Sequence, residues 1–327
     1  RGVFVWDWDG WVDGFLGMAR RSAIRTLPVP PPHLMVSVAG GSPVHMSNAI
    51  ARTFSSPDRV IVRVPATEPF ETIVARVEDA QPHILQGYPS MLHRLALEAT
   101  SGRLSISPVE ILAGSEVLSE ETRALLTDVW GAPVGDLYAT TDVGPIASSC
   151  DHGTLHLCDD LVIVEVVDQH GDPVPDGTEG DHLIVTGLVN HALPLLRYEL
   201  DDRVTISSEA CPCGSAHRSL RSVGGRTPDV FTFGDATVHP VTLSGALAGD
   251  RRIADWRAIR VPSGLAVDVV AVDVDRLDVR DVQERLRSRL ARAGVRLDEV
   301  IVQVRVVPVI DRPASGKVRR YVTATEG

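Results

Sequence analysis

The sequence lacks the features that recruit proteins to membranes or nucleic acids. No apolar run reaches the roughly 18 residues of a membrane-spanning helix, and we do not expect the first residues, Arg1-Gly2-Val3-Phe4, to act as a signal peptide. Lys and Arg number 32 against 43 Asp and Glu, the formal net charge is -11, and no basic stripe occurs. Because nucleic acids and anionic membranes are bound by clusters of Lys and Arg, we expect a cytoplasmic protein with neither partner. A monomer and a homodimer both remain open.

Cysteine is scarce as well. The four cysteines are Cys150, Cys158, Cys211 and Cys213. Four are too few for a disulfide scaffold in a chain of 327 residues. Their clustering indicates metal binding instead.

The length and residue composition of the chain indicate a globular protein of two domains. At 327 residues the chain is too long for one ordinary core. Hydrophobic residues make up 44% and charged residues 23%, which excludes disordered and fibrous classes.

The first half alternates strand-like and helical segments, which predicts an α/β core with a largely parallel sheet. Strands are expected at 60–64, 83–85 and 109–113, each followed by a helix. Thr67 is expected to cap the first helix, Pro89 to precede the second and Ser119 to open the third. The proline run from Pro28 to Pro32 predicts a stiff loop.

The second half is organised differently. Strand patterns between residues 161 and 205 predict a β subdomain at about 155–224, which with the α/β core forms a large domain of residues 1–224. A strand at 266–274, a helix at 281–293 and a strand at 300–307 predict a small α+β domain of residues 225–327.

Three short motifs carry candidate chemistry. Residues 136–144 contain an aromatic ring, hydroxyls and a carboxylate where open α/β sheets bind ligands, which suits a nucleotide with Mg²⁺. Residues 194–202 end in the carboxylate pair Asp201-Asp202, which can accept hydrogen bonds from ribose. Residues 313–320 place Lys317 on a Ser-Gly loop, where it can neutralise a reacting phosphoryl group. Taken singly, each is more often a polar loop or a basic tail.

In this order and spacing the three motifs resemble the adenylate-forming superfamily of acyl-CoA synthetases, and most closely its phenylacetate-CoA ligase family. The resemblance extends to residues 81–90, 113–119 and 225–229, so it covers nearly the whole chain. It implies a large α/β domain with a β subdomain and a small, mobile C-terminal domain that rotates between two half-reactions. The first joins a carboxylic acid and ATP as acyl-AMP, and the second passes the acyl group to a thiol, usually of coenzyme A.

The resemblance also implies roles for individual residues. Gly114, Ser115 and Glu116 would line the adenine site and Tyr138 would stack on the base. Thr141 would bind the α-phosphate, Asp142 would occupy the Mg²⁺ position and Asp202 would bind the ribose. Arg226 would lie near the nucleotide, and Lys317 would bridge the acyl carboxylate and the phosphate.

Three departures from the family pattern affect this interpretation. The family's phosphate loop is absent, and Arg1-Gly2-Val3-Phe4 resembles the segment directly after that loop. We therefore expect the chain, which lacks an initial Met, to start just past the loop. Asp142 stands where the family usually has Glu. Pro228 replaces the usual hinge Asp, and because proline fixes φ near -65° the hinge must move through ψ and its neighbours.

Cys150, His156, Cys211 and Cys213 are a candidate Zn²⁺ site, because three Cys and one His form a tetrahedral structural site. The two halves lie about 55 residues apart, so spacing alone does not bring them together. Some phenylacetate-CoA ligase relatives carry the same pattern, which favours zinc over free thiols. Cys158 is kept as a reserve ligand, since it shares a strand face with His156 if that segment is extended.

Three functions remain open. The first is an acid:CoA ligase acting on a small carboxylic acid with ATP. The second keeps the adenylation but passes the acyl group to a carrier-protein thiol or an amine, for which Pro228 and the low aromatic content of 5% leave room. The third is a catalytically silent binding protein on a ligase scaffold.

Overall fold

The structure is a computed structural model that describes residues 3–23, 29–42, 46–313 and 315–324. Arg1 and Gly2 of the expected post-loop start, Pro28 of the proline run and Ala314 of the Lys317 motif lie outside the described residues.

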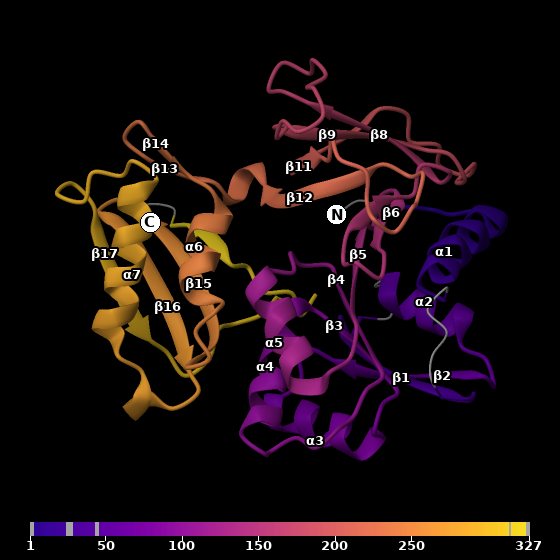
Figure 1. Cartoon of the computed structure of the whole chain (residues 1–327), viewed down its shortest axis with the longest axis horizontal. Coiled ribbons are helices and arrows are strands. Elements are labelled where there is room, and N and C mark those ends of the chain that lie inside the picture. Colours follow the sequence, from indigo (N-terminus) through magenta and orange to yellow (C-terminus); the bar gives the residue numbers. More distant parts are fainter. Residues whose placement is uncertain (1–2, 24–28, 43–45, 314, 325–327) are drawn as a thin grey trace.

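A nine-stranded mixed sheet forms the centre of the large domain (Figure 1). Its strands, in spatial order, are β11 (Asp202–Ile206), β12 (Ser219–Arg226), β7 (Leu155–Leu157), β6 (Gly144–Ser149), β5 (Val134–Thr140), β4 (Glu110–Gly114), β3 (Ile84–Gly87), β1 (His33–Ala39) and β2 (Arg59–Pro65). The five strands β1 to β5 run parallel to one another, and every pairing that involves β6, β7, β11 or β12 is antiparallel. The expected α/β core is confirmed, but only its first half is parallel.

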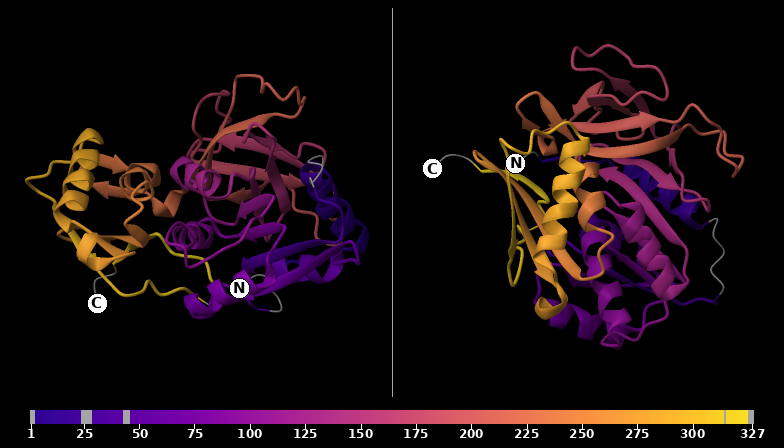
Figure 2. Two further views of the ribbon diagram at one scale, coloured as in Figure 1. Left: turned by 60° about the horizontal axis from the view of Figure 1, so that its bottom comes forward. Right: turned by 60° about the vertical axis from the view of Figure 1, so that its left-hand side comes forward.

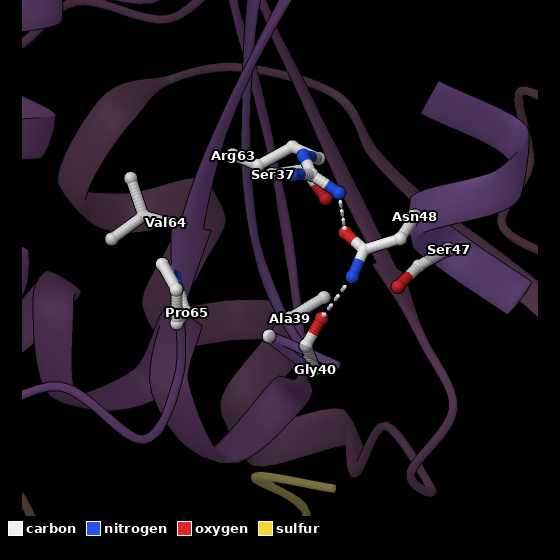
Figure 3. Close-up of a pocket in the computed structure, with 9 residues that line it drawn as sticks. Ser37, Ala39, Gly40, Ser47, Asn48, Arg63, Val64 and Pro65 are labelled. Carbon is white, nitrogen blue, oxygen red and sulfur yellow. Dashed lines mark hydrogen bonds between the residues drawn. The ribbon is translucent and has the colours of Figure 1, made fainter. Parts of the chain in front are cut away.

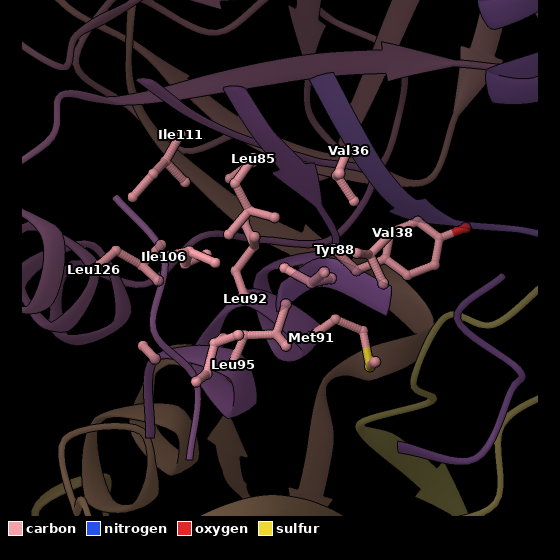
Figure 4. Packing of buried hydrophobic residues seen from close by; sticks show 14 of the residues in the cluster. Val36, Val38, Leu85, Tyr88, Met91, Leu92, Leu95, Ile106, Ile111 and Leu126 are labelled. Atoms are coloured by element: carbon pink, nitrogen blue, oxygen red, sulfur yellow. The ribbon is translucent and has the colours of Figure 1, made fainter. Parts of the chain in front are cut away.

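The helices of the large domain are α1 (Trp8–Ala23), α2 (Met46–Phe54), α3 (Phe70–Ala80), α4 (Pro89–Thr100) and α5 (Glu120–Trp130). Helix α4 is buried along much of its length against the parallel strands, and Figure 4 shows Leu92 and Leu95 below Leu85 and Ile111. This packing of apolar side chains stabilises the sheet.

The predicted helix starts were correct in two of three cases. Ser119 caps α5, since its Oγ accepts the backbone N–H of Thr122 at 3.2 Å, and α4 starts at Pro89. The prediction that Thr67 caps α3 is wrong. The N-cap residue is Pro69, whose hydrocarbon side chain offers no capping hydrogen bond, and its ring restricts φ where the chain enters the helix.

The β-rich region is divided between two sheets. Strands β8 (Val162–Val167), β9 (His182–Gly187) and β10 (Tyr198–Leu200) form an antiparallel sheet of three strands. The other strands of residues 155–224 extend the nine-stranded sheet instead. The strand pattern predicted extended chain correctly, but alternation does not reveal which sheet a strand joins.

The small domain has a hydrophobic cluster of its own (Figure 1). Its elements are β13 (Phe231–Phe233), β14 (Ala236–Val238), α6 (Pro240–Leu247), β15 (Ile253–Val261), β16 (Gly264–Ala271), α7 (Val279–Arg292), β17 (Ile301–Val306) and β18 (Tyr321–Thr323), with short 3₁₀ turns at Thr227–Asp229 and Val274–Arg276. The predicted helix and two strands are found with shifted ends. The predicted domain boundary after residue 224 falls inside β12.

The segment between β17 and β18 leaves the small domain and runs to the large domain before it returns (Figure 2). This excursion carries Lys317. Within the described ranges, no helix is long and apolar enough to cross a membrane.

Candidate functional site

The carboxyl ends of the parallel strands meet at one edge of the sheet, which is where α/β sheets bind ligands. The chain leaves β1 at Gly40, β3 at Tyr88, β4 at Ser115 and β5 at Thr141. Segments separated by about 100 residues are therefore neighbours here.

A small pocket that opens to solvent lies beside this edge (Figure 3). Asn48 of α2 organises its polar side: its Nδ2 donates to the Gly40 carbonyl at 3.3 Å and its Oδ1 accepts from Arg63. Ser37 lies on the same side. Sequence reasoning missed these residues, because no motif marks them.

Tyr138, Asp202 and Arg226 come together next to the turn after β5. Asp202 begins β11 and Arg226 ends β12, and the two residues are paired in the sheet register, with Nε of Arg226 3.9 Å from Oδ2 of Asp202. Burial, together with the Asp202 carboxylate, raises the pKa of Tyr138. Burial also raises the pKa of Asp202 against the opposing charge of Arg226.

The predicted phosphate and Mg²⁺ residues lie on the turn of residues 141–143. Thr140 is buried and its Oγ1 accepts the backbone N–H of Val143 at 3.2 Å, which shapes the turn. Thr141 is exposed. Burial raises the pKa of Asp142, and Arg226 opposes that shift, so Asp142 faces the same guanidinium as Asp202.

Lys317 is placed at this cluster although it lies far along the chain. Burial lowers the pKa of Lys317 and the charge of Arg226 lowers it further, whereas Glu116 and Asp202 raise it. The preceding residue, Gly316, has φ +76°, and an added Cβ would lie 3.0 Å from Cβ of Ala66. The loop therefore sits tightly on the large domain.

Glu116 lies at the contact between the domains. Its Oε2 accepts the backbone N–H of Ser90 at 3.1 Å, and its Oε1 accepts that of Val318 at 2.9 Å. Ser115 before it has φ +68°, and Gly114 approaches the Leu137 carbonyl closely. The carboxylate of Glu116 thus anchors the Lys317 loop, a contact that its expected place at the adenine site did not suggest.

Cys150, His156, Cys211 and Cys213 converge in a second cluster, with one potential ligand atom from each within 4.8 Å of all the others. Sγ of Cys150 is 3.8 Å from Sγ of Cys211, and Nε2 of His156 is 3.3 Å from Sγ of Cys213. Nδ1 of His156 lies 3.1 Å from the His217 carbonyl, which orients Nε2 toward the thiols. The donor set and its closeness fit a tetrahedral metal ion.

Cys158, the expected reserve ligand, is outside this cluster. It is fully buried in the core of the β-rich region, and burial raises the pKa of its thiol to about 11. Its role is apolar packing. The interpretation of Cys158 as a ligand is therefore wrong.

Comparison with known proteins agrees with the motifs. No family model matches the chain. A phenylacetate-coenzyme A ligase of Thermus thermophilus is 27% identical over 281 residues, covering 77% of this chain and 62% of that protein. A phenylacetate-coenzyme A ligase of Aromatoleum evansii is 24% identical over 216 residues, which cover 63% of this chain and 48% of that protein. The chain thus spans about three fifths or less of these relatives' lengths.

Solved structures decide the fold. A 2-hydroxyisobutyryl-CoA ligase in the postadenylation state, in complex with an acyl-AMP, superposes with TM-score 0.77 at 18% identity, covering 95% of this chain and 69% of that one. The chain has the adenylate-forming ligase fold. The same ligase in its thioesterification state superposes with a TM-score of 0.55, covering 94% of this chain and 68% of that one. The chain therefore superposes better on the postadenylation structure than on the thioesterification structure. The resemblance to phenylacetate-CoA ligases is confirmed.

Proposed function

We propose that this protein activates a carboxylic acid with ATP as an acyl-adenylate and then transfers the acyl group to coenzyme A. The observation that carries the proposal is the position of the Lys317 loop on the large domain: the backbone N–H of Val318, next to Lys317, donates to Glu116 at 2.9 Å. The charges of Arg226 and Asp202 are near enough to shift the pKa of Lys317. Burying the charged ammonium of Lys317 at the domain contact costs free energy of desolvation, which a basic tail without a function would avoid by staying in solvent.

In the first half-reaction a carboxylate oxygen of the acid attacks the α-phosphorus of ATP, and pyrophosphate leaves. Thr141 binds the α-phosphate, and the Lys317 ammonium offsets the negative charge that develops between carboxylate and phosphate. Tyr138 stacks on the adenine, which Gly114, Ser115 and Glu116 border. Asp202 accepts hydrogen bonds from the ribose, and Arg226 lies near the nucleotide at the domain junction.

In the second half-reaction the thiolate of coenzyme A attacks the acyl carbon, and AMP leaves. This step needs another domain orientation, for which we propose a hinge at Arg226–Asp229. The 3₁₀ turn Thr227–Asp229 contains Pro228, whose φ is fixed, so its neighbours must supply the rotation.

We assign two metal ions to the protein. Asp142, on the turn beside Arg226, would hold Mg²⁺ with the phosphates, because carboxylate and phosphate oxygens are its preferred ligands. Cys150, His156, Cys211 and Cys213 would hold a structural Zn²⁺, supported by the closeness of their four donor atoms. The zinc would tie together the neighbouring strands β6, β7 and β12 of the large sheet and take no part in the reaction.

The proposal is tested by incubating the full-length protein with ATP, Mg²⁺, coenzyme A and a panel of aryl and aliphatic acids. Release of AMP together with an acyl-CoA product is expected for at least one acid. A protein that binds ATP and Mg²⁺ but turns over no acid is a silent scaffold, and the proposal is then wrong.

Transfer to a carrier-protein thiol or an amine is the second candidate. Pro228 favours it, because a restricted hinge alters the rotation on which discharge by coenzyme A depends. If acyl-AMP accumulates and coenzyme A does not discharge it, this candidate replaces the first for the second half-reaction.

A further inference from the structure

The loop that carries Lys317 is tied at both ends to one buried carboxylate. Asp255 lies on β15 with its side chain 2% exposed. Its Oδ2 accepts from Nη2 of Arg312 at 3.0 Å, and its Oδ1 accepts from Nη1 of Arg320 at 2.6 Å. Burial alone would raise the pKa of Asp255, but Arg320, Arg312 and Arg94 hold it below its ordinary value. The carboxylate is therefore charged and closes the chain around Lys317.

Arg312 also reaches across the domain interface. Its Nη1 donates to Oγ of Ser90 at 3.0 Å and to the Gly316 carbonyl at 2.9 Å. Ser90 is buried in the first turn of α4 in the large domain, and Gly316 directly precedes Lys317. One guanidinium, 8% exposed, thus joins the small domain, the large domain and the backbone beside Lys317.

Rotation of the small domain would affect these contacts unequally. Asp255 moves with Arg312, so their ion pair can persist. Ser90 remains with the large domain, so its hydrogen bond to Arg312 must break. The bonds from the Tyr88 hydroxyl to the Ser315 carbonyl, 2.8 Å, and from the Val318 N–H to Glu116 break for the same reason.

We propose that Arg312 is a positioning residue for adenylation, which fixes the Lys317 loop on the large domain only while the two domains are closed. The proposal rests on the proposed function. It adds that the closed state is selected by one buried side chain bound to both domains, and that the same side chain is dispensable for thioester formation.

The first experiment separates the half-reactions in the full-length protein. Ser90→Ala removes only the hydroxyl and should slow acyl-AMP formation on the order of 10-fold, the effect of one charge-assisted hydrogen bond. Arg312→Gln should slow it on the order of 10²-fold, because the contacts to Asp255 and Gly316 also weaken. Discharge of a supplied acyl-adenylate by coenzyme A should stay unchanged or become faster. Arg319→Gln, exposed on the same loop, is the control and should alter neither step.

Equal losses in both half-reactions, or no loss in either, overturn the proposal. Hydrogen exchange gives a readout that does not depend on activity. In both variants the Val318 amide should exchange faster while the amide of Val267, in the core of the small domain, keeps its protection. If the wild type forms no acyl-AMP, the proposed function has failed, and Val318 exchange alone decides the role of Arg312. Unchanged Val318 exchange in Ser90→Ala and Arg312→Gln means that Arg312 does not position the loop.

Discussion

Asp201 and Asp202 are adjacent in sequence and differ sharply in their surroundings. Asp202 is 8% exposed and faces Tyr138 and Arg226, whereas Asp201 is exposed. The proposed ribose contact is therefore assigned to Asp202, which lies beside Tyr138 and Arg226. Asp202→Ala should raise the KM for ATP and weaken AMP binding roughly 10- to 100-fold, since each hydrogen bond to a charged group contributes about 1.5–3 kcal/mol.

Asp201→Ala is the matched control for this prediction, and isothermal titration with AMP measures both variants. Loss of binding in Asp201→Ala and not in Asp202→Ala would show that the motif had been aligned one residue out of register.

The ammonium of Lys317 is held at a site where burial lowers its pKa, so its placement there has a cost in free energy. Lys317→Ala should reduce acyl-AMP formation on the order of 10²-fold or more, as removal of other preorganised charges at reacting groups does. Discharge of a supplied acyl-adenylate should change little. Pyrophosphate release and thioester formation, measured separately, check the split. Unchanged pyrophosphate release would mean that residues 313–320 are a basic tail with no role in adenylation.

Among the elements, the cluster of Cys150, His156, Cys211 and Cys213 depends partly on strands β7 and β12, which the sequence analysis assigned to the β subdomain. Cys150 follows β6, His156 lies in β7, and Cys211 and Cys213 lie in the loop before β12. Pairing of β7 with both β6 and β12 brings the two halves together. The residue types suggested the ligands, but a separation of about 55 residues could not show that they meet.

Cys211→Ser should lower zinc content and melting temperature together, because a structural site contributes directly to folding. Cys158→Ala is the control: its thiol is buried in the core, so this variant should lower the melting temperature while keeping the zinc. Metal analysis of protein purified without chelator measures the content. Absence of zinc from the wild type would contradict the assignment.

The elements also show which signals were local. The cap at Ser119 and the strand cores of the parallel region could be predicted, because each depends on a few neighbouring residues. The prediction that Thr67 caps α3 was wrong for an equally local reason, because the helix begins after Pro69, two residues later. The bond between Ser90 and Arg312 joins residues 222 apart, so no local pattern announces it.

At the scale of the whole molecule, the contact between the two domains includes a buried histidine, His93, whose protonated form is disfavoured by burial. His93 of α4 is 8% exposed, and its Nε2 donates to the Ile253 carbonyl of the small domain at 3.2 Å. Burial lowers the pKa of His93; Arg320 and Arg94 lower it further, while the contact with Ile253 and the charge of Asp255 raise it. The net direction is downward, so the closed arrangement favours the neutral ring.

This direction of the His93 pKa sets the sign of the pH dependence. With the domains apart His93 gains solvent, so its pKa moves up toward the ordinary histidine value of about 6.5, whereas the closed arrangement disfavours the protonated ring. Closure is therefore unaffected above about pH 7 and weakens progressively as the pH falls below about 6.5. Acyl-AMP formation and Val318 amide protection should decline together in this range. His93→Gln cannot be protonated but can still donate to the Ile253 carbonyl, so it should remove this part of the decline. An identical pH profile in wild type and His93→Gln would show that another group governs closure.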